Sequence, residues 1–180
     1  MKKKNIIIVG SIVLLVLIVL VSVLVVNKID SDKELKRQGE TIVNDYETFK
    51  GNVEKLNEFR THYQNDIVVN QFVETVKDEY ETWVLELDEY TELIDKVSDS
   101  TENLEKLCKN NYSDKNVSNK CDAYIDAYEK VINYYINDVN SFNSIVKEYK
   151  EENKKSEIKE YELKYDYIDV NKDDKFEGKN

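Results

Sequence analysis

Three stretches of this chain repeat apolar residues at alternating steps of three and four, the spacing of a helix that buries one side against another helix. Only Gly39 and Arg60 interrupt the first stripe, and the other two continue without a gap. The chain has no proline and only four glycines, so the strong helix breakers are almost absent. The first stripe comprises Leu35, Ile42, Tyr46, Phe49, Val53, Leu56, Tyr63 and Ile67; the second comprises Val69, Val73, Val76, Tyr80, Trp83, Leu87, Tyr90, Ile94, Val97, Thr101, Leu104 and Cys108; the third comprises Cys121, Ile125, Tyr128, Ile132, Tyr135, Val139, Phe142, Val146 and Tyr149.

The stripes predict three helices, because the second is out of phase with the first and a polar segment, residues 109–120, separates it from the third. A turn is expected at Gln64, Asn65 and Asp66, where Asn or Asp can cap the next helix. The predicted fold class is all-α, an elongated antiparallel three-helix bundle of coiled-coil type within residues 27–152. The expected helices cover about residues 31–63, 66–108 and 119–152.

The third stripe is broader than the other two. Additional apolar residues lie beside it on the same side of the expected helix, which suits a helix that packs against two neighbours rather than one. These residues are Ala123, Tyr124, Ala127, Val131 and Tyr134. A two-helix hairpin that completes its core by dimerising is the alternative to the three-helix bundle.

Residues 6–26 form an apolar run in which only Gly10, Ser11 and Ser22 are not strongly apolar. About 20 such residues span the hydrocarbon layer of a bilayer as a helix. A secretory signal has a shorter apolar core and a small-residue cleavage site, and no such site is found near Val26. The run is therefore predicted to be an N-terminal transmembrane signal anchor that is not cleaved, and removal as a signal peptide is the alternative.

Three lysines at positions 2–4 precede this run. They predict that residues 1–5 form a cytoplasmic leader and that the bulk of the chain, anchored in membrane lipid through residues 6–26, is extracytoplasmic. The chain carries 26 Lys and Arg against 37 Asp and Glu, a formal net charge of −11. Because a surface of that sign repels phosphates, no nucleic-acid partner is expected.

The two cysteines lie at equivalent ends of two stripes. Cys108 ends the second stripe and Cys121 begins the third, so an antiparallel turn would bring both to the same end of the core. A disulfide is predicted, since such a bond persists outside the cytoplasm, and two buried free thiols are the alternative. A zinc site is disfavoured because two cysteines alone do not complete its tetrahedral ligand set.

Residues 169–180, DVNKDDKFEGKN, place oxygen-bearing side chains at alternate positions. This segment resembles the calcium-binding loop of EF-hand and dockerin modules, which implies Ca²⁺ as an optional ligand where otherwise no cofactor is expected. Asp174 departs from the family pattern because a glycine normally makes the turn there, and Asn180 departs because a bidentate carboxylate normally closes the shell. A solvated acidic tail is the alternative. The ligands that the resemblance implies are Asp169, Asn171, Asp173, Lys175, Glu177 and Asn180.

An acidic, tyrosine-rich tail, residues 153–180, follows the expected bundle and contains this loop. Its first part fits two kinds of secondary structure equally well, and the sequence does not choose between them. The pattern of a strand is carried by Tyr161, Leu163, Tyr165 and Tyr167, and the pattern of a helix by Ile158, Tyr161, Tyr165 and Ile168.

The chain is predicted not to be an enzyme. His62 is its only histidine, and no Ser, Cys or acidic neighbour in the sequence suggests a catalytic assembly around it. Glycine-rich phosphate loops and zinc signatures are absent from the sequence. The many carboxylates have the spacing of the solvated outer faces of helices.

These features predict a membrane-anchored, extracytoplasmic helical scaffold or binding protein of a bacterial cell surface, with an unidentified protein partner and the option of forming a homo-oligomer. Tyr112, Tyr124 and Tyr134 are candidate partner contacts, because tyrosine is enriched at interfaces, although ordinary packing also explains Tyr124 and Tyr134. The alternative function is that of an accessory or sensor subunit which acts on a membrane complex through its transmembrane helix.

Overall fold

The computed structural model describes residues 2–68, 71–154 and 156–168, with side chains from residue 21 onward. Every secondary-structure element in these ranges is helical. The chain divides into two compact units, residues 1–41 and residues 42–180. The all-α fold class is therefore confirmed for the described part of the chain.

The first unit consists of the N-terminal part of helix α1 (Lys2–His62). Its apolar side chains from Val21 to Val26 are at least half exposed, and Leu35, the first residue of the first stripe, is 37% exposed. Among the residues whose side chains are described, no helix is both long enough and apolar enough to cross a membrane. Most of the predicted anchor, residues 6–26, lies outside that described set.

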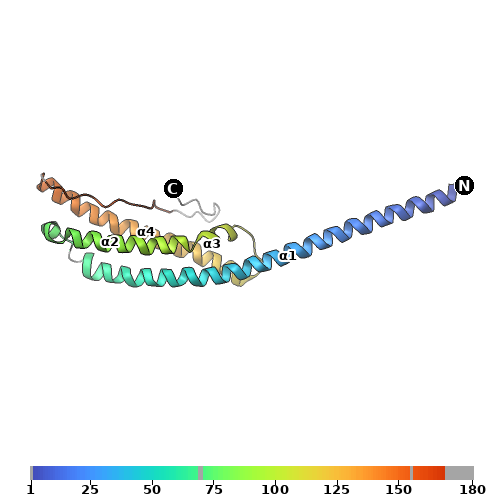
Figure 1. The fold of residues 1–180 in the computed structure, drawn as a ribbon, viewed down its shortest axis with the longest axis horizontal. Coiled ribbons are helices and arrows are strands. Elements are labelled where there is room, and N and C mark those ends of the chain that lie inside the picture. Colours follow the sequence, from blue (N-terminus) through green and yellow to red (C-terminus); the bar gives the residue numbers. More distant parts are fainter. Residues whose placement is uncertain (1, 69–70, 155, 169–180) are drawn as a thin grey trace. The chain divides into compact units, whose positions relative to one another are not determined.

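The second unit contains the rest of α1 and two further long helices, α2 (Val76–Asp99) and α4 (Lys115–Glu152). The ribbon in Figure 1 shows the three running side by side, with α2 antiparallel to both of the others. Shorter elements connect them: a π-helical turn η1 (Tyr63–Ile67), a 3₁₀ turn η3 (Val73–Thr75) and helix α3 (Glu102–Leu107). The order is that of the predicted three-helix bundle.

The turn between the first two helices does not lie where the sequence placed it. Residues 64–66 continue the helix as the π-helical turn η1, and the chain leaves the helix only after Val68. Tyr63 and Ile67, the last two residues of the first stripe, begin and end this turn, so the second stripe starts after it. Consequently α2 begins at Val76 rather than near residue 66, and its N-cap position is occupied by Thr75 rather than by Asn or Asp.

The second predicted helix is divided into α2 and α3. At the break, the Ser100 hydroxyl donates to the carbonyl of Val97 at 2.6 Å, and the Thr101 hydroxyl donates to that of Ser98 at 2.7 Å. Such side-chain bonds compete with the helical hydrogen-bond ladder and favour its interruption. The buried stripe nevertheless continues across the break, since Thr101 is 2% exposed and Leu104 is fully buried.

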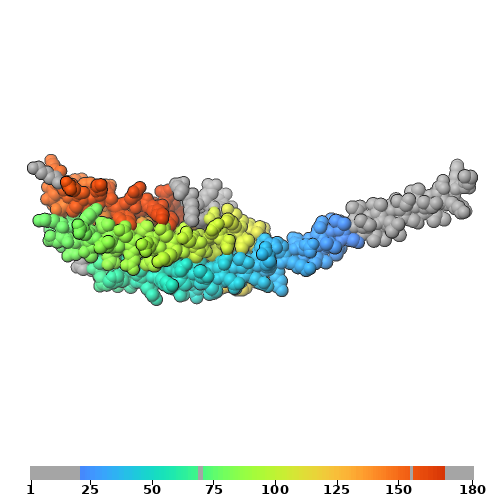
Figure 2. Space-filling view, in the orientation of Figure 1, coloured from blue at the N-terminus to red at the C-terminus, as the bar shows by residue number. Residues whose placement is uncertain are grey.

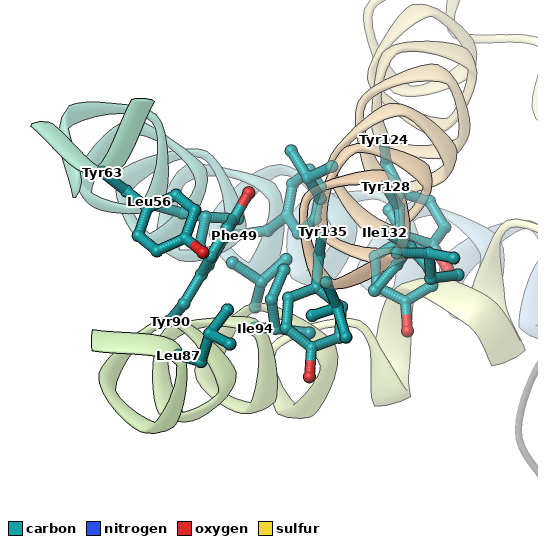
Figure 3. Close-up of a cluster of buried hydrophobic side chains, with 14 of the residues drawn as sticks. Phe49, Leu56, Tyr63, Leu87, Tyr90, Ile94, Tyr124, Tyr128, Ile132 and Tyr135 are labelled. Carbon is teal, nitrogen blue, oxygen red and sulfur yellow. The ribbon is translucent and has the colours of Figure 1, made fainter. Parts of the chain in front are cut away.

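Most core residues lie on the predicted stripes, and several of them are tyrosines, although Val117 and Ile136 of α4 are buried outside the stripes. Side chains from α1, α2 and α4 point toward one another in Figure 3. Helix α1 contributes one buried residue in each heptad, whereas α4 buries a broad face that includes Tyr124 and Val131, as the width of its stripe predicted. The largest fully buried side chains are Trp83, Tyr63, Tyr90, Tyr124, Tyr128, Tyr135, Phe49, Phe142, Ile42, Leu56, Leu87 and Ile94.

A charged pair lies within this core, where the first stripe is interrupted. The Nε atom of Arg60 on α1 donates to Asp138 Oδ2 on α4 at 2.9 Å, and their side chains are only 21% and 11% exposed. The Tyr90 hydroxyl of α2 donates to the same oxygen at 3.1 Å. Because Asp138 receives donors from two other helices, it joins all three long helices at one level of the bundle.

The predicted disulfide between Cys108 and Cys121 is present, with the two Cα atoms 5.5 Å apart. It joins the end of α3 to the beginning of α4, close to the N-cap of α4, where the Asp114 side chain accepts from the amide of Asn116 at 2.8 Å. Helix α4 begins at Lys115 rather than near residue 119, so the disulfide reaches its second turn.

Opening the disulfide should lower the free energy of unfolding. The bond spans a sequence separation of 13 residues. Without the bond the unfolded chain regains the conformational entropy that the closed loop had lost. We therefore expect the free energy of unfolding to fall by about 3 kcal/mol. Urea unfolding of a Cys108→Ser/Cys121→Ser variant, followed by circular dichroism, measures this cost, with reductant added to the unaltered chain as the matched comparison. An unchanged urea midpoint would contradict the prediction.

Removing the Arg60 side chain should destabilise the bundle by about 3 kcal/mol, because it leaves the Asp138 carboxylate buried without its cation. Adding Asp138→Asn to Arg60→Ala should restore part of that stability, since the neutral amide can still accept from Tyr90. Unfolding free energies of the two single variants and the double variant test this coupling. Additive losses would show that the charge pair carries no coupling energy.

Candidate functional site

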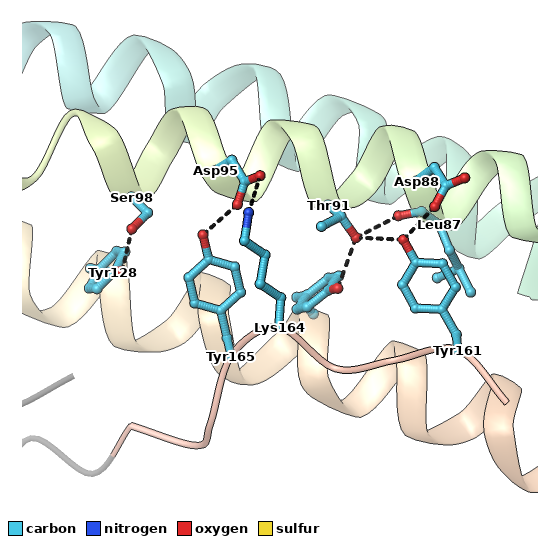
Figure 4. Close-up of polar contacts among 10 residues, drawn as sticks. Leu87, Asp88, Thr91, Asp95, Ser98, Tyr128, Tyr161, Lys164 and Tyr165 are labelled. Atoms are coloured by element: carbon cyan, nitrogen blue, oxygen red, sulfur yellow. Dashed lines mark hydrogen bonds and ion pairs between the residues drawn. The ribbon is translucent and has the colours of Figure 1, made fainter. Parts of the chain in front are cut away.

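An extended segment at residues 156–168, here called the strap, lies along the outside of the bundle against α2 and α4 (Figures 1 and 4). In the space-filling view of Figure 2 the strap, in red, lies beside the green surface of α2. It is neither helix nor strand, although Tyr161, Leu163 and Tyr165 alternate with exposed residues as a strand would. Tyr167, the last residue of the strand pattern, is exposed, while all four residues of the helix pattern are half-buried, so neither pattern is confirmed.

Two asparagines of α4 hold the main chain of the strap. The Asn143 amide donates to the Tyr161 carbonyl at 2.9 Å, and its oxygen accepts from the Tyr161 amide at 2.6 Å. Asn133 makes the same pair of bonds to Ile168, at 2.8 and 3.0 Å. An asparagine side chain offers one donor and one acceptor side by side, so each imitates a neighbouring strand.

A tyrosine of α2 provides a third main-chain contact. The Tyr80 hydroxyl donates to the Lys159 carbonyl at 2.9 Å and lies 3.3 Å from the Lys159 amide, from which it accepts. All three anchors, Tyr80, Asn143 and Asn133, therefore engage atoms that every non-proline residue possesses. They fix the path of an extended segment without selecting its side chains.

Selection by side chains comes from two aspartates of α2, as Figure 4 shows. The Tyr161 hydroxyl donates to Asp88 Oδ1 at 2.7 Å. The Tyr165 hydroxyl donates to Asp95 Oδ1 at 2.6 Å, while Lys164 Nζ donates to Asp95 Oδ2 at 2.6 Å. The two strap tyrosines are four residues apart, and their hydroxyls donate to two carboxylates that lie two turns apart on α2.

Thr91 connects the strap to the core. Its hydroxyl lies 3.0 Å from the Tyr161 hydroxyl, 2.8 Å from that of Tyr135 and 2.8 Å from the Leu87 carbonyl, and its single proton is donated to one of these three oxygens. A chain of hydroxyls therefore runs from the buried face of α4 to the strap. Such chains strengthen their members by polarisation in a poorly hydrated environment.

Burial raises the pKa of Tyr161 and of Tyr165, and the carboxylates of Asp88 and Asp95 that accept from these hydroxyls raise it further. Both tyrosines are therefore protonated at neutral pH and act as donors. A phosphate or sulfate on either hydroxyl would remove the donor and place a second negative charge beside a carboxylate.

The term docking face is used below for the side chains of the bundle that hold the strap. Four of them share one side of α4 at helical spacing, since the Asn137 oxygen accepts from the Tyr167 hydroxyl at 2.6 Å and the Asn140 amide donates to it at 3.3 Å. The members of the docking face are Tyr80, Asp88, Thr91, Asp95, Asn133, Asn137, Asn140 and Asn143. The helical spacing of these asparagines is visible in the sequence and could have indicated a polar contact face on this helix.

The three tyrosines predicted to contact a partner are not brought together with the docking face. Tyr124 is 1% exposed and packs edge-on against Phe49 at 5.3 Å between ring centroids, which fits the alternative of ordinary packing. Tyr134 is half-buried beneath the Arg60 guanidinium, 4.0 Å from its ring centroid. Tyr112 is half-buried, and its hydroxyl donates to the Leu107 carbonyl at 3.0 Å.

The predicted calcium ligands, residues 169–180, lie outside the described residues, so calcium binding there stays a prediction. Within the described ranges, no group of three or more His, Cys, Asp or Glu side chains is arranged to hold a metal ion. His62 does have an acidic neighbour, contrary to expectation, since its Nδ1 atom lies 2.6 Å from Asp66 Oδ2. Both side chains are more than half exposed, as in an ordinary surface pair.

Removing an asparagine anchor should release the strap locally. Asn143→Ala deletes two hydrogen bonds to Tyr161, and Asn133→Ala deletes two to Ile168. We expect the amide of the freed residue to exchange its hydrogen about thirty-fold faster, because two such bonds together contribute about 2 kcal/mol. Hydrogen exchange followed by NMR measures this. Asn119→Ala, at an exposed position of the same helix, is the matched control, and equal exchange in all variants would contradict the prediction.

Comparisons of the chain with protein-family models, with curated proteins and with solved structures find no match. The interpretation of the docking face therefore depends on its own geometry.

Proposed function

We propose that this chain is a membrane-anchored, extracytoplasmic helical scaffold and binding protein with no catalytic role. The observation that carries the binding part of the proposal is the docking face, where side chains of two helices hold the main chain of an extended segment at Lys159, Tyr161 and Ile168. Recognition through main-chain atoms, with alternate side chains providing selectivity, is a recurrent way in which proteins bind extended peptides.

The polar groups of the docking face support binding rather than catalysis. Each carboxylate on it is engaged by a strap side chain, Asp88 by Tyr161 and Asp95 by Tyr165 and Lys164. A general acid or base must instead reach a bound substrate and exchange a proton with it. The stable, fully paired arrangement is that of a recognition surface.

The disulfide and the apolar run support the proposed location. A bond between Cys108 and Cys121 is expected to persist in an oxidising compartment outside the cytoplasm. The run at residues 6–26 has the length and apolar composition of a membrane-spanning helix in the sequence. In this proposal the run is the anchor, the lysines at positions 2–4 stay inside, and the bundle is presented outside.

Protease treatment of intact cells tests the proposed location. In a chain with an epitope after residue 180, we expect external protease to destroy the epitope while the chain remains in the membrane fraction after alkaline carbonate washing. Leu14→Arg/Leu17→Arg should abolish membrane retention, because an arginine at the centre of a spanning helix costs about 3 kcal/mol. Leu14→Ile/Leu17→Ile is the matched control and should behave as the unaltered chain.

An epitope that is protected in intact cells but digested after lysis would overturn the extracytoplasmic location. Carbonate-soluble chain of full length would overturn the anchor. Co-purification of a membrane complex that requires residues 6–26, in a chain whose docking face is disabled by Asn133→Ala/Asn143→Ala, would instead favour the accessory-subunit function.

A further inference from the structure

The strap follows α4 in the chain, and its contacts with the docking face do not depend on that connection. Helix α4 ends at Glu152, and the chain reverses at Asn153, whose carbonyl accepts from the Ser156 amide at 2.8 Å. The hydrogen bonds and the ion pair between the docking face and residues 159–168 are non-covalent. An identical segment on another molecule would meet the same partners.

The strap is less buried than the three long helices of the second unit. Its half-buried residues Ile158, Tyr161, Leu163, Tyr165 and Ile168 pack against the core but none of its described residues is fully buried, whereas the three long helices share a continuous buried core and a disulfide. Segments with few buried contacts open locally while the rest of a domain stays folded. Release of the strap therefore leaves the docking face intact and its hydrogen-bonding groups available.

The docking face matches the sequence of the strap at several separate points. Asp95 receives both Lys164 and Tyr165, and Asp88 receives Tyr161. Beyond the docking face, Glu160 lies 3.4 Å from the ammonium group of Lys147. Main-chain anchors alone would accept many extended segments. The additional side-chain contacts require two tyrosines, a lysine and a glutamate at the spacing found in residues 156–168.

We propose that the docking face of one copy binds the strap of a second copy, so that the chain associates with itself by strap exchange. Exchange of an identical element is a low-cost route to association, because each contact of the closed monomer is replaced by an equivalent one between molecules. This proposal rests on the proposed function in one respect, namely that anchored copies share a membrane surface and so reach the local concentrations at which exchange competes with the tethered strap.

Two complementary full-length variants test the exchange. One carries Tyr161→Ala/Tyr165→Ala, which disables its strap and leaves its docking face open. The other carries Asn133→Ala/Asn143→Ala, which disables its docking face and leaves its strap free. With a different affinity tag on each and both in detergent micelles, we expect co-capture from the mixture to exceed self-capture of either variant by about ten-fold, because only the mixture pairs an unaltered strap with an unaltered docking face.

Two controls make the result decisive. Circular dichroism and the presence of the Cys108–Cys121 bond establish that both variants are folded. Mixing two differently tagged copies of an Asn119→Ala variant gives the level of co-capture expected when each docking face is occupied by its own strap. Co-capture of the complementary variants at the level of either variant alone would overturn strap exchange. Because the assay uses micelles, its failure leaves the membrane location untouched, and failure of the protease experiment leaves strap exchange untouched.

A photo-crosslinker provides a second readout in which Tyr161, Tyr165, Asn133 and Asn143 stay unaltered. Tyr167 is suited to replacement by benzoylphenylalanine, since its side chain is 59% exposed and its hydroxyl reaches Asn137 of α4. When the labelled chain is illuminated with an excess of tagged unlabelled chain, exchange produces a covalent dimer attached through α4 of the tagged copy. Cross-links confined to α4 of the labelled copy itself, at every concentration tested, would overturn the proposal.

Discussion

Buried tyrosine hydroxyls impose the constraint on which the second unit depends. Burying a hydroxyl without a hydrogen-bond partner costs free energy, so each tyrosine in this core needs a polar neighbour that a leucine or valine would not need. Tyr90 finds Asp138, Tyr128 finds Ser98 and Tyr135 finds Thr91. Polar residues therefore occupy positions that apolar ones would otherwise take. The packing of the helices is specified by these directional bonds as well as by the shape of the apolar side chains.

The same constraint explains the charged pair of Arg60 and Asp138. Taking two charges out of water is costly, and the pair is tolerated because Asp138 also receives the Tyr90 hydroxyl and because Arg60 lies over the ring of Tyr134. An apolar stripe with a heptad repeat is degenerate, since a helix displaced by one heptad buries similar residues. A polar cluster that only one alignment satisfies removes this degeneracy.

The strap extends this bonding from the core to the surface. Through Thr91, the hydroxyl of the core residue Tyr135 is linked to that of Tyr161 in the strap. On α4, the apolar side chains face the bundle while the asparagines between them face the strap, so one helix serves both purposes. A helix presents adjacent faces at a spacing of three and four residues, which makes this division of roles possible. Structural packing and segment binding are therefore parts of one arrangement.

The sequence by itself determined the helical class, the buried residues and the cysteine pair, because these depend on periodicity and on order along the chain. The stripes located Trp83, Leu87 and Ile94 in the core without reference to their neighbours. The tertiary structure alone decided that Arg60, which interrupts the first stripe, pairs with Asp138, that residues 63–67 form a π-helical turn, and that the asparagines of α4 hold the strap. Each of these depends on which groups meet across a distance of many residues. The periodicity of apolar residues along the chain does not predict such contacts. A polar residue on the outer face of a helix fits the same sequence pattern whether it contacts water or another segment.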